Sequence, residues 1–237
     1  MIKIQCRIAH YILKYFDSSF TFEFLKKDGD HCANGDIAFY TEGPSLLLLQ
    51  AERLVLNIMQ RMSGIATTTH RYVQELQGLK TKVLDTRKTT PGFRFLEKEA
   101  VRIGGGVNHR FGLFDMILIK DNHIDFSGGI RQAIEKVNSY LAKTGLNLKI
   151  EVEARTFDDI KIILETGKIH RIMLDNFSVN DTKEAVKMIA GKFETESSGG
   201  ITLENLRQYG ECGVDFISVG ALTHHINSLD LSLKAIN

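Results

Sequence analysis

Short apolar segments recur at intervals from residue 82 onward, and helical patterns fill most of the stretches between them. The apolar segments span residues 82–86, 115–120, 148–153, 171–175, 192–196 and 215–220. Strands that alternate with helices predict a parallel sheet with crossover helices, and nearly continuous apolar strands predict that both faces of the sheet are covered. This number of units favours an open or incomplete β/α barrel over a closed barrel of about eight strands.

The chain before these units has a different pattern. Residues 1–43 alternate short apolar stretches with turns that contain glycine, which predicts a small β-rich region with one leading helix. Residues 44–79 place apolar side chains at helical spacing, and Ser63-Gly64 predicts a break between two helices. We therefore expect a small domain with connecting helices at residues 1–79 and the barrel at residues 80–237.

Composition and charge limit the function classes. With 43% hydrophobic and 25% charged residues, the chain has the composition of a soluble globular protein. Its net charge of +1 lacks the broad positive field of non-specific nucleic-acid binding, so phosphate recognition must be local. Its 3 cysteines are widely separated and lack metal-ligand spacing, which predicts reduced thiols in a cytoplasmic protein. Its apolar runs are too short to span a bilayer, so we expect no membrane partner.

Polar residues follow each predicted strand. They are Asp85-Thr86-Arg87-Lys88, Lys120-Asp121-Asn122-His123, Glu151 with Glu153, Asp175-Asn176, Glu196-Ser197-Ser198-Gly199-Gly200 and Gly220-Ala221. The carboxyl ends of parallel strands meet at one rim of such a fold, where functional groups collect. A single polar strand end is usually an ordinary turn, but the repetition predicts a rim that carries both signs of charge.

Two glycine-rich loops are further candidates. The stretch "VRIGGGVNHRFGL" places three glycines before Asn108-His109-Arg110, which favours a ligand cradle over a merely flexible loop. The stretch "ESSGG" precedes a predicted helix start at Thr202, so free N–H groups and the helix dipole would face an anion; the alternative is a flexible linker. His224-His225 is not expected to bind a metal, because adjacent residues on a helix point apart.

Several long segments together resemble one enzyme family. They are "AERLVLNIMQRMSGIAT", "LDTRKTTPGFRFLEKEAVRIGGGVNHRFGLFDMILIKDNHI", "EVEA", "LDNF", "ESSGG" and "VGALTH". The chain from about Gly43 to its C-terminus resembles the carboxylating nicotinate-nucleotide pyrophosphorylases, also called quinolinate phosphoribosyltransferases. This resemblance implies an incomplete β/α barrel with a small N-terminal α/β sandwich domain. It also implies homodimers in which each active site is completed by the partner subunit.

The resemblance further implies a reaction and its residues. Quinolinate and phosphoribosyl pyrophosphate, with Mg²⁺, would give nicotinate mononucleotide, pyrophosphate and CO₂, a step of NAD biosynthesis. The implied substrate-binding residues are Arg53 from the partner chain, Arg87, Lys88, His109, Arg110, Lys120, Ser198, Gly199, Gly220 and His224. Lys120, Glu153 and Asp175 are the implied catalytic residues, and the two acids are also the implied metal ligands. Cationic groups suit a dicarboxylate and a pyrophosphate, while acids would stabilise positive charge that develops on the ribose.

One departure and two alternatives qualify this interpretation. Family members usually begin with a helix and an acidic Glu-Asp-x-Gly-x-Gly-Asp stretch, whereas this sequence opens with "MIKIQCRIAHYILKYF", so we expect a shortened small domain. A related branch of molybdenum-transport-associated pyrophosphorylase-like proteins is disfavoured by "LIKDNH". A non-catalytic binding module on the same barrel is disfavoured because Lys120, Glu153 and Asp175 are all present.

Overall fold

The computed structural model describes residues 2–236, which divide into two compact units. Unit 1 contains the residues up to 73, residues 88–107 and the residues from 220 onward. Unit 2 contains residues 74–87 and 108–219. Each unit consists of several segments of the chain, so the two units do not meet at a single point in the sequence. The domain boundary expected near residue 79 stays a prediction. No helix in the described part of the chain combines the length and the apolar character needed to cross a membrane.

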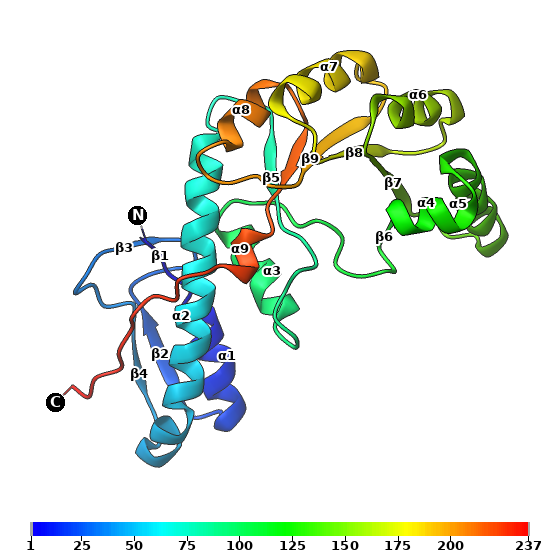
Figure 1. Ribbon diagram of the computed structural model, residues 1–237. Helices are drawn as coiled ribbons and strands as arrows, with labels where there is room; N and C mark the ends of the chain where they lie inside the picture. The colour runs from blue at the N-terminus through cyan, green and yellow to red at the C-terminus, as the bar shows by residue number, and fades with distance from the viewer. Residues whose placement is uncertain (1, 237) are drawn as a thin grey trace. The chain divides into compact units, whose positions relative to one another are not determined.

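Unit 2 is built on a six-stranded parallel sheet. Its strands are β5 (Lys82–Leu84), β6 (Met116–Ile119), β7 (Lys149–Ala154), β8 (Arg171–Asp175), β9 (Glu194–Ser198) and β10 (Phe216–Ser218). Their order in the sheet is β5-β10-β9-β8-β7-β6. The first strand therefore pairs with the last, as in a barrel, but β5 and β6 remain as the two edges (Figure 1). The predicted incomplete β/α barrel is confirmed.

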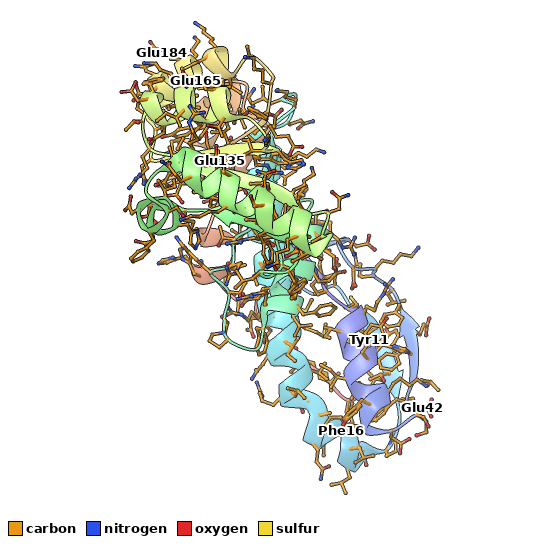
Figure 2. The ribbon with its side chains drawn as sticks, turned by 90° about the vertical axis from the view of Figure 1, so that its right-hand side faces the viewer. Tyr11, Phe16, Glu42, Glu135, Glu165 and Glu184 are labelled. Carbon is orange, nitrogen blue, oxygen red and sulfur yellow. The ribbon has the colours of Figure 1, made fainter. Side chains whose placement is uncertain are left out.

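Helices connect these strands. They are α4 (Asp121–Ser127), α5 (Ile130–Thr144), α6 (Phe157–Thr166), α7 (Val179–Ile189) and α8 (Leu206–Glu211). Thr156 caps α6. Its hydroxyl accepts the Asp159 N–H at 3.1 Å, and the Asp159 carboxylate accepts the Thr156 N–H at 3.0 Å. The side chain of Ser178 caps α7 by accepting the Asp181 N–H at 3.1 Å. The exposed faces carry charge, as Glu135, Glu165 and Glu184 on α5, α6 and α7 show (Figure 2).

Unit 1 begins with the predicted small β-rich region. Strands β1 (Ile2–Lys3) and β3 (His31–Cys32) form one antiparallel pair, and β2 (Thr21–Phe24) and β4 (Phe39–Glu42) form another. Helix α1 (Arg7–Phe16) packs here through a core that consists of Ala9, Leu13, Phe20, Ala51, Val55 and Met59. Helices α3 (Arg94–Ile103) and α9 (Ala221–His224) complete the unit. The predicted N-terminal β-rich region with one helix is thus confirmed, although the helix follows β1.

The helix α2 runs from Ser45 to Glu75 without a break, so the predicted break at Ser63-Gly64 is wrong. Both residues are buried, and Ser63 Oγ accepts the backbone N–H of Gln5 at 3.1 Å. A Cβ atom on Gly64 would lie 2.3 Å from the carbonyl oxygen of Asn227. Small residues here let two distant segments of unit 1 approach the helix closely, and a helix tolerates them where such packing compensates.

Candidate active site

The polar strand residues of unit 2 share one face of the sheet. The register pairs Glu151 with Arg171, Met173 with Glu196, and Asp175 with Ser198. Side chains two residues apart on a strand lie on the same face, so Glu153 belongs to this face as well. The opposite face presents buried apolar side chains, namely Ile150, Val152, Ile172 and Leu174. The structure thus brings the predicted acids Glu153 and Asp175 onto the same surface as Ser198.

His109 is held by side chains from several strand segments of unit 2. Its backbone N–H donates to Asp85 Oδ1 at 2.8 Å, just after β5. Its Nε2 atom lies 2.9 Å from Glu151 Oε2 on β7 and 3.5 Å from Glu196 Oε2 on β9. Its Nδ1 atom accepts the backbone N–H of Arg110 at 2.7 Å, so the ring hydrogen is on Nε2 and faces the two carboxyl groups.

Arg171 completes a buried ionic cluster with His109, Glu151 and Glu196. Its Nη1 atom donates to Glu196 Oε2 at 3.0 Å, and its guanidinium lies 3.9 Å above the ring centroid of Phe216. Both glutamate side chains are fully buried. Burial raises the pKa of Glu196 to about 8, and the charge of Glu151 adds to this rise. Burial of two adjacent carboxyl groups therefore favours the retention of a proton by the pair, while Arg171 favours the charged form of both groups.

Glu196→Gln is expected to flatten the pH dependence of unfolding. The pKa of Glu196 rises from 4.5 to about 8 in the fold, so the folded protein holds a proton that the unfolded chain releases between these values. Stability from this group is present below pH 4.5 and is lost as the pH rises through about 8. The amide does not titrate, so denaturant unfolding from about pH 5 to 8 should show a weaker decline for the variant than for the wild type. The exposed Glu184→Gln is the control, and equal declines for all three proteins would contradict the assignment.

Sequence reasoning missed this cluster. Glu151 and Glu196 were expected to be rim groups, yet both lie within strands and their carboxyl groups are buried. Arg171 was expected only as the start of a strand. A signal was available, because "KIEVEA" and "ETESS" place charged residues two apart, which assigns them to one face.

Arg110 and Arg87 form a candidate anion site in unit 2. Arg110 is buried to 8% exposure, and its Nη1 atom donates to the Met116 carbonyl at 3.3 Å. Burial lowers the pKa of Arg110, and the nearby positive charge of Arg87 lowers it further, while the charges of Glu151 and Asp115 oppose this shift. Two guanidinium groups that repel each other gain most from an anion that contacts both.

Glu153, Asp175 and Lys120 interact electrostatically in the same unit. Burial raises the pKa of Glu153, and the charge of Asp175 adds to the rise, while Lys120 opposes it. The Asn176 amide donates to Asp175 Oδ2 at 2.9 Å, and the Asn176 backbone N–H donates to the Ser198 carbonyl at 2.8 Å. Asn176 thus fixes Asp175 beside the end of β9, a role that the sequence did not reveal.

The glycines of the "ESSGG" loop are explained by packing and backbone conformation, and not by the predicted helix start that would face an anion. A Cβ atom on Gly199 would lie 2.1 Å from Asn176 Oδ1, and its φ of +99° also requires glycine. Helix α8 begins only at Leu206, so the predicted helix start at Thr202 is wrong and the dipole argument for "ESSGG" fails. Asn205 closes a turn there, because its side chain accepts the Thr202 N–H at 2.8 Å and donates to the Gly200 carbonyl at 3.1 Å.

The three consecutive glycines of unit 1 mostly serve packing. A Cβ atom on Gly104 would lie 2.5 Å from the Ala66 carbonyl oxygen, and one on Gly106 would lie 2.8 Å from Thr69 Cγ2. Both contacts are with helix α2, so these glycines let α2 approach the end of α3. The ligand cradle that the sequence favoured is therefore not needed to explain them.

Unit 1 contains a pocket of about 550 Å³ with a cationic lining. Its lining is Arg61, Lys88, Thr89, Thr90, Thr223, His224, His225, Ile226 and Asn227. This lining includes two of the predicted substrate-binding residues, Lys88 and His224, but not Arg53. Because its charged side chains are basic and hydroxyl groups accompany them, the pocket suits an anion.

The prediction that His224 and His225 point apart is wrong. Their ring centroids lie 4.5 Å apart, and their Nδ1 atoms contact each other. Helix α9 ends at His224, and His225 has φ −129° and ψ 65°, which turns its side chain back toward its neighbour. Burial lowers the pKa of His224, and the charges of His225 and Lys88 lower it further. A Cβ atom on Gly220 would lie 2.7 Å from His224 Nε2, so the glycine makes room for this ring.

Arg53 lies on an exposed face of α2. Leu46 and Leu49, which are 66% and 68% exposed, precede it by seven and four residues and therefore share its face. The structure thus places Arg53 in an exposed apolar setting rather than in the cationic pocket of unit 1.

A β/α barrel that collects charged groups at the ends of its strands is an arrangement typical of enzymes that act on charged small molecules. The model of the family "Quinolinate phosphoribosyl transferase, C-terminal domain" matches residues 65–234, and that of its N-terminal domain matches residues 7–63. The chain therefore belongs to the quinolinate phosphoribosyltransferase family.

Individual relatives agree with this assignment. The chloroplastic nicotinate-nucleotide pyrophosphorylase [carboxylating] of Arabidopsis thaliana is 45% identical over 241 residues, which cover 96% of this chain and 69% of the relative. A probable nicotinate-nucleotide pyrophosphorylase [carboxylating] of Bacillus subtilis is 46% identical over 208 residues, or 88% and 71% of the two chains. The crystal structure of NadC from Streptococcus pyogenes matches with a TM-score of 0.92 at 37% identity, covering 99% of this chain and 82% of that one. These relatives favour the main interpretation over both alternatives.

Proposed function

We propose that the protein transfers the phosphoribosyl group of phosphoribosyl pyrophosphate to quinolinate with decarboxylation, which gives nicotinate mononucleotide, pyrophosphate and CO₂. The observation that carries this proposal is that unit 2 combines the Arg87 and Arg110 pair with the carboxyl pair of Glu153 and Asp175. The first pair suits a dicarboxylate substrate, and the second suits a reaction in which positive charge develops on a sugar. Family membership supports the same reaction.

The residues of the chain can assist each chemical change. Arg87 and Arg110 would orient quinolinate, with bidentate contacts to its carboxylates, so that its ring nitrogen attacks the ribose carbon from which pyrophosphate departs. Glu153 and Asp175 would stabilise the positive charge on that carbon, and Lys120 the charge on the leaving group. The resulting pyridinium accepts the electron pair of the breaking ring–carboxylate bond, CO₂ leaves, and a proton takes its place on the ring carbon.

We propose Mg²⁺ as the cofactor, held by Glu153 and Asp175. Carboxylate oxygens are the ligands that this cation prefers, and a cation would relieve the repulsion that contributes to the raised pKa of Glu153. When bound, it would neutralise charge on the departing pyrophosphate. His109, Ser198, Gly199, Gly220 and His224 stay proposed substrate-binding residues.

We also propose a homodimer in which Arg53 completes the site of the partner subunit. The exposure of Arg53 beside Leu46 and Leu49 supports an interface on this face of α2. A cytoplasmic location is proposed from the free thiols of Cys6, Cys32 and Cys212. The Arabidopsis relative is named as chloroplastic, so location can differ among relatives.

Release of labelled CO₂ from carboxyl-labelled quinolinate tests the proposed function. Release should require both phosphoribosyl pyrophosphate and Mg²⁺, and nicotinate should be a poor substrate because it lacks one carboxylate. Absence of release from folded protein would contradict the proposal. Binding of both substrates without turnover would instead support the non-catalytic module.

Arg110→Ala is expected to weaken quinolinate binding by about tenfold to a hundredfold. The variant loses a charge-assisted contact worth roughly 1.5 to 3 kcal/mol. Isothermal calorimetry with quinolinate measures this change, and the exposed Arg131→Ala on α5 is the matched control. An affinity that equals that of the control would remove Arg110 from the site.

A further inference from the structure

A hydrogen-bonded ion pair lies behind the cationic pocket of unit 1. Arg61 on α2 donates from Nε to Glu97 Oε1 on α3 at 2.9 Å, and its Nη2 atom contacts the same oxygen. The Glu97 side chain is 1% exposed, whereas Arg61 is 27% exposed because it also lines the pocket. Glu97 therefore anchors an arginine whose other side faces the ligand space.

The same pair holds the segment that carries Lys88. Glu97 Oε2 accepts the backbone N–H of Thr90 at 3.1 Å, and Arg61 Nη2 donates to Thr90 Oγ1 at 2.7 Å. Thr90 is thus fixed through both its backbone and its side chain. Since Thr90 is two residues from Lys88, these bonds restrict the backbone from which the lysine extends.

A second branch reaches the end of the pocket that carries the histidines. Arg61 Nη2 lies 3.3 Å from the Thr223 carbonyl oxygen, and the Thr223 hydroxyl donates to the Lys88 carbonyl at 2.9 Å. Thr223 directly precedes His224. The pair therefore connects α2 and α3 with both segments that supply cationic groups to the pocket.

Stability alone does not explain this arrangement. Taking a carboxylate and a guanidinium out of water costs about as much as their attraction returns, and apolar side chains of similar size often serve a fold equally well. An apolar pair could not make the bonds to Thr90 and Thr223. The arrangement is therefore better matched to positioning than to holding the unit together.

We propose that Arg61 and Glu97 are positioning residues that hold Lys88, Thr90 and His224 in the geometry that binds a phosphate or pyrophosphate group. This inference rests on the proposed function, since phosphoribosyl pyrophosphate is the substrate that presents such groups. Neither residue has a chemical role in the reaction. They fix the cationic lining before the ligand arrives, so less ordering remains to be done on binding.

The first test uses Glu97→Gln, which keeps the shape of the side chain but removes its charge. The KM for phosphoribosyl pyrophosphate should rise about tenfold, while the KM for quinolinate should stay within about twofold. Arg61→Lys should show the same split, because lysine keeps the charge but lacks the fork that reaches Glu97, Thr90 and Thr223 at once. Equal rises in both KM values would overturn the proposal.

The second test separates positioning from folding. The double variant Arg61→Met/Glu97→Leu replaces the pair by apolar side chains, and we expect its midpoint of thermal unfolding to stay near that of the wild type. Its KM for phosphoribosyl pyrophosphate should nevertheless rise at least about tenfold. The matched control is Arg102→Met/Glu99→Leu, a surface ion pair on the same helix α3, which should leave both KM values unchanged. A double variant with wild-type KM values would overturn the proposal.

Calorimetry with inorganic pyrophosphate and Mg²⁺ keeps this inference distinct from the proposed function. Absence of labelled CO₂ release from the wild type would contradict the function, yet pyrophosphate binding could still be compared between wild type and variants. If Glu97→Gln binds pyrophosphate about tenfold more weakly than the wild type, the result supports the proposal that Glu97 positions the residues that line the pocket. Unchanged affinity would overturn it, whatever the outcome of the activity assay.

Discussion

Asp175→Asn and Glu153→Gln are each expected to lower kcat by at least about a hundredfold while quinolinate affinity changes by less than about threefold. Positive charge develops on the ribose only as the bond to pyrophosphate breaks, so a carboxylate that stabilises this charge acts on the transition state and not on bound quinolinate. Single-turnover release of labelled CO₂ measures the rate, and calorimetry measures quinolinate binding.

Two controls show whether a lower kcat results from the loss of the specific carboxylate or from a general effect of the substitution. Asp158→Asn removes an exposed carboxylate near the start of α6 and should leave kcat unchanged. Glu153 is buried, so its variant must also retain the circular dichroism and unfolding midpoint of the wild type. Losses of similar size in kcat and in quinolinate affinity would mean that the two acids shape the site rather than stabilise charge in the reaction.

The strands of the barrel could be predicted because their signal is local. Most of the expected segments are apolar runs flanked by polar residues, although residues 192–196 contain only one apolar side chain. All the expected segments coincide with β5 to β10 within a few residues. The open edge between β5 and β6 agrees with the small number of units, since a sheet of this size can curve without closing. Charged groups at the ends of these strands follow from the same pattern.

The wrong predictions, of a helix break and of a helix start, have a different cause. In both places the local sequence pattern reflects contacts made in the folded protein and not the secondary structure that it usually indicates. Ser63-Gly64 was interpreted as a helix break, but it permits close contact with Gln5 and Asn227. The helix expected from Thr202 starts later because the side chain of Asn205 closes a turn. No local pattern reveals such partners, which lie elsewhere in the fold or depend on the conformation of one side chain.

The buried cluster around His109 could be predicted only in part. Alternation assigns Glu151 and Glu153 to one face of β7, and Glu194 and Glu196 to one face of β9. Only the register shows that these are the same face of the sheet and that Arg171 on β8 belongs to it. The loop that carries His109 has no periodicity, so its approach to these carboxyl groups could not be inferred from the sequence. Site residues on strands were thus more predictable than the contacts that orient them.

The proposed sharing of sites between subunits can be tested by mixing two inactive variants. Arg53→Ala and Arg110→Ala are each expected to keep less than about a tenth of wild-type activity when quinolinate is limiting, since each lacks one cationic contact to the substrate. If Arg53 acts across a two-fold interface, a mixed dimer contains one site with both arginines and one site with neither. Activity on mixing should therefore exceed the residual activity of either variant alone.

The size of the recovery follows from random pairing of equal amounts of the two chains. About half of the dimers are mixed and each has one intact site of two, so activity should approach about a quarter of the wild-type value after refolding together. Two differently tagged chains, isolated as the mixed species, establish that exchange has occurred. Mixing Arg110→Ala with the doubly substituted Arg53→Ala/Arg110→Ala is the control, because no combination of those chains supplies Arg110. If isolated mixed dimers of the two single variants are no more active than that control, Arg53 serves its own subunit.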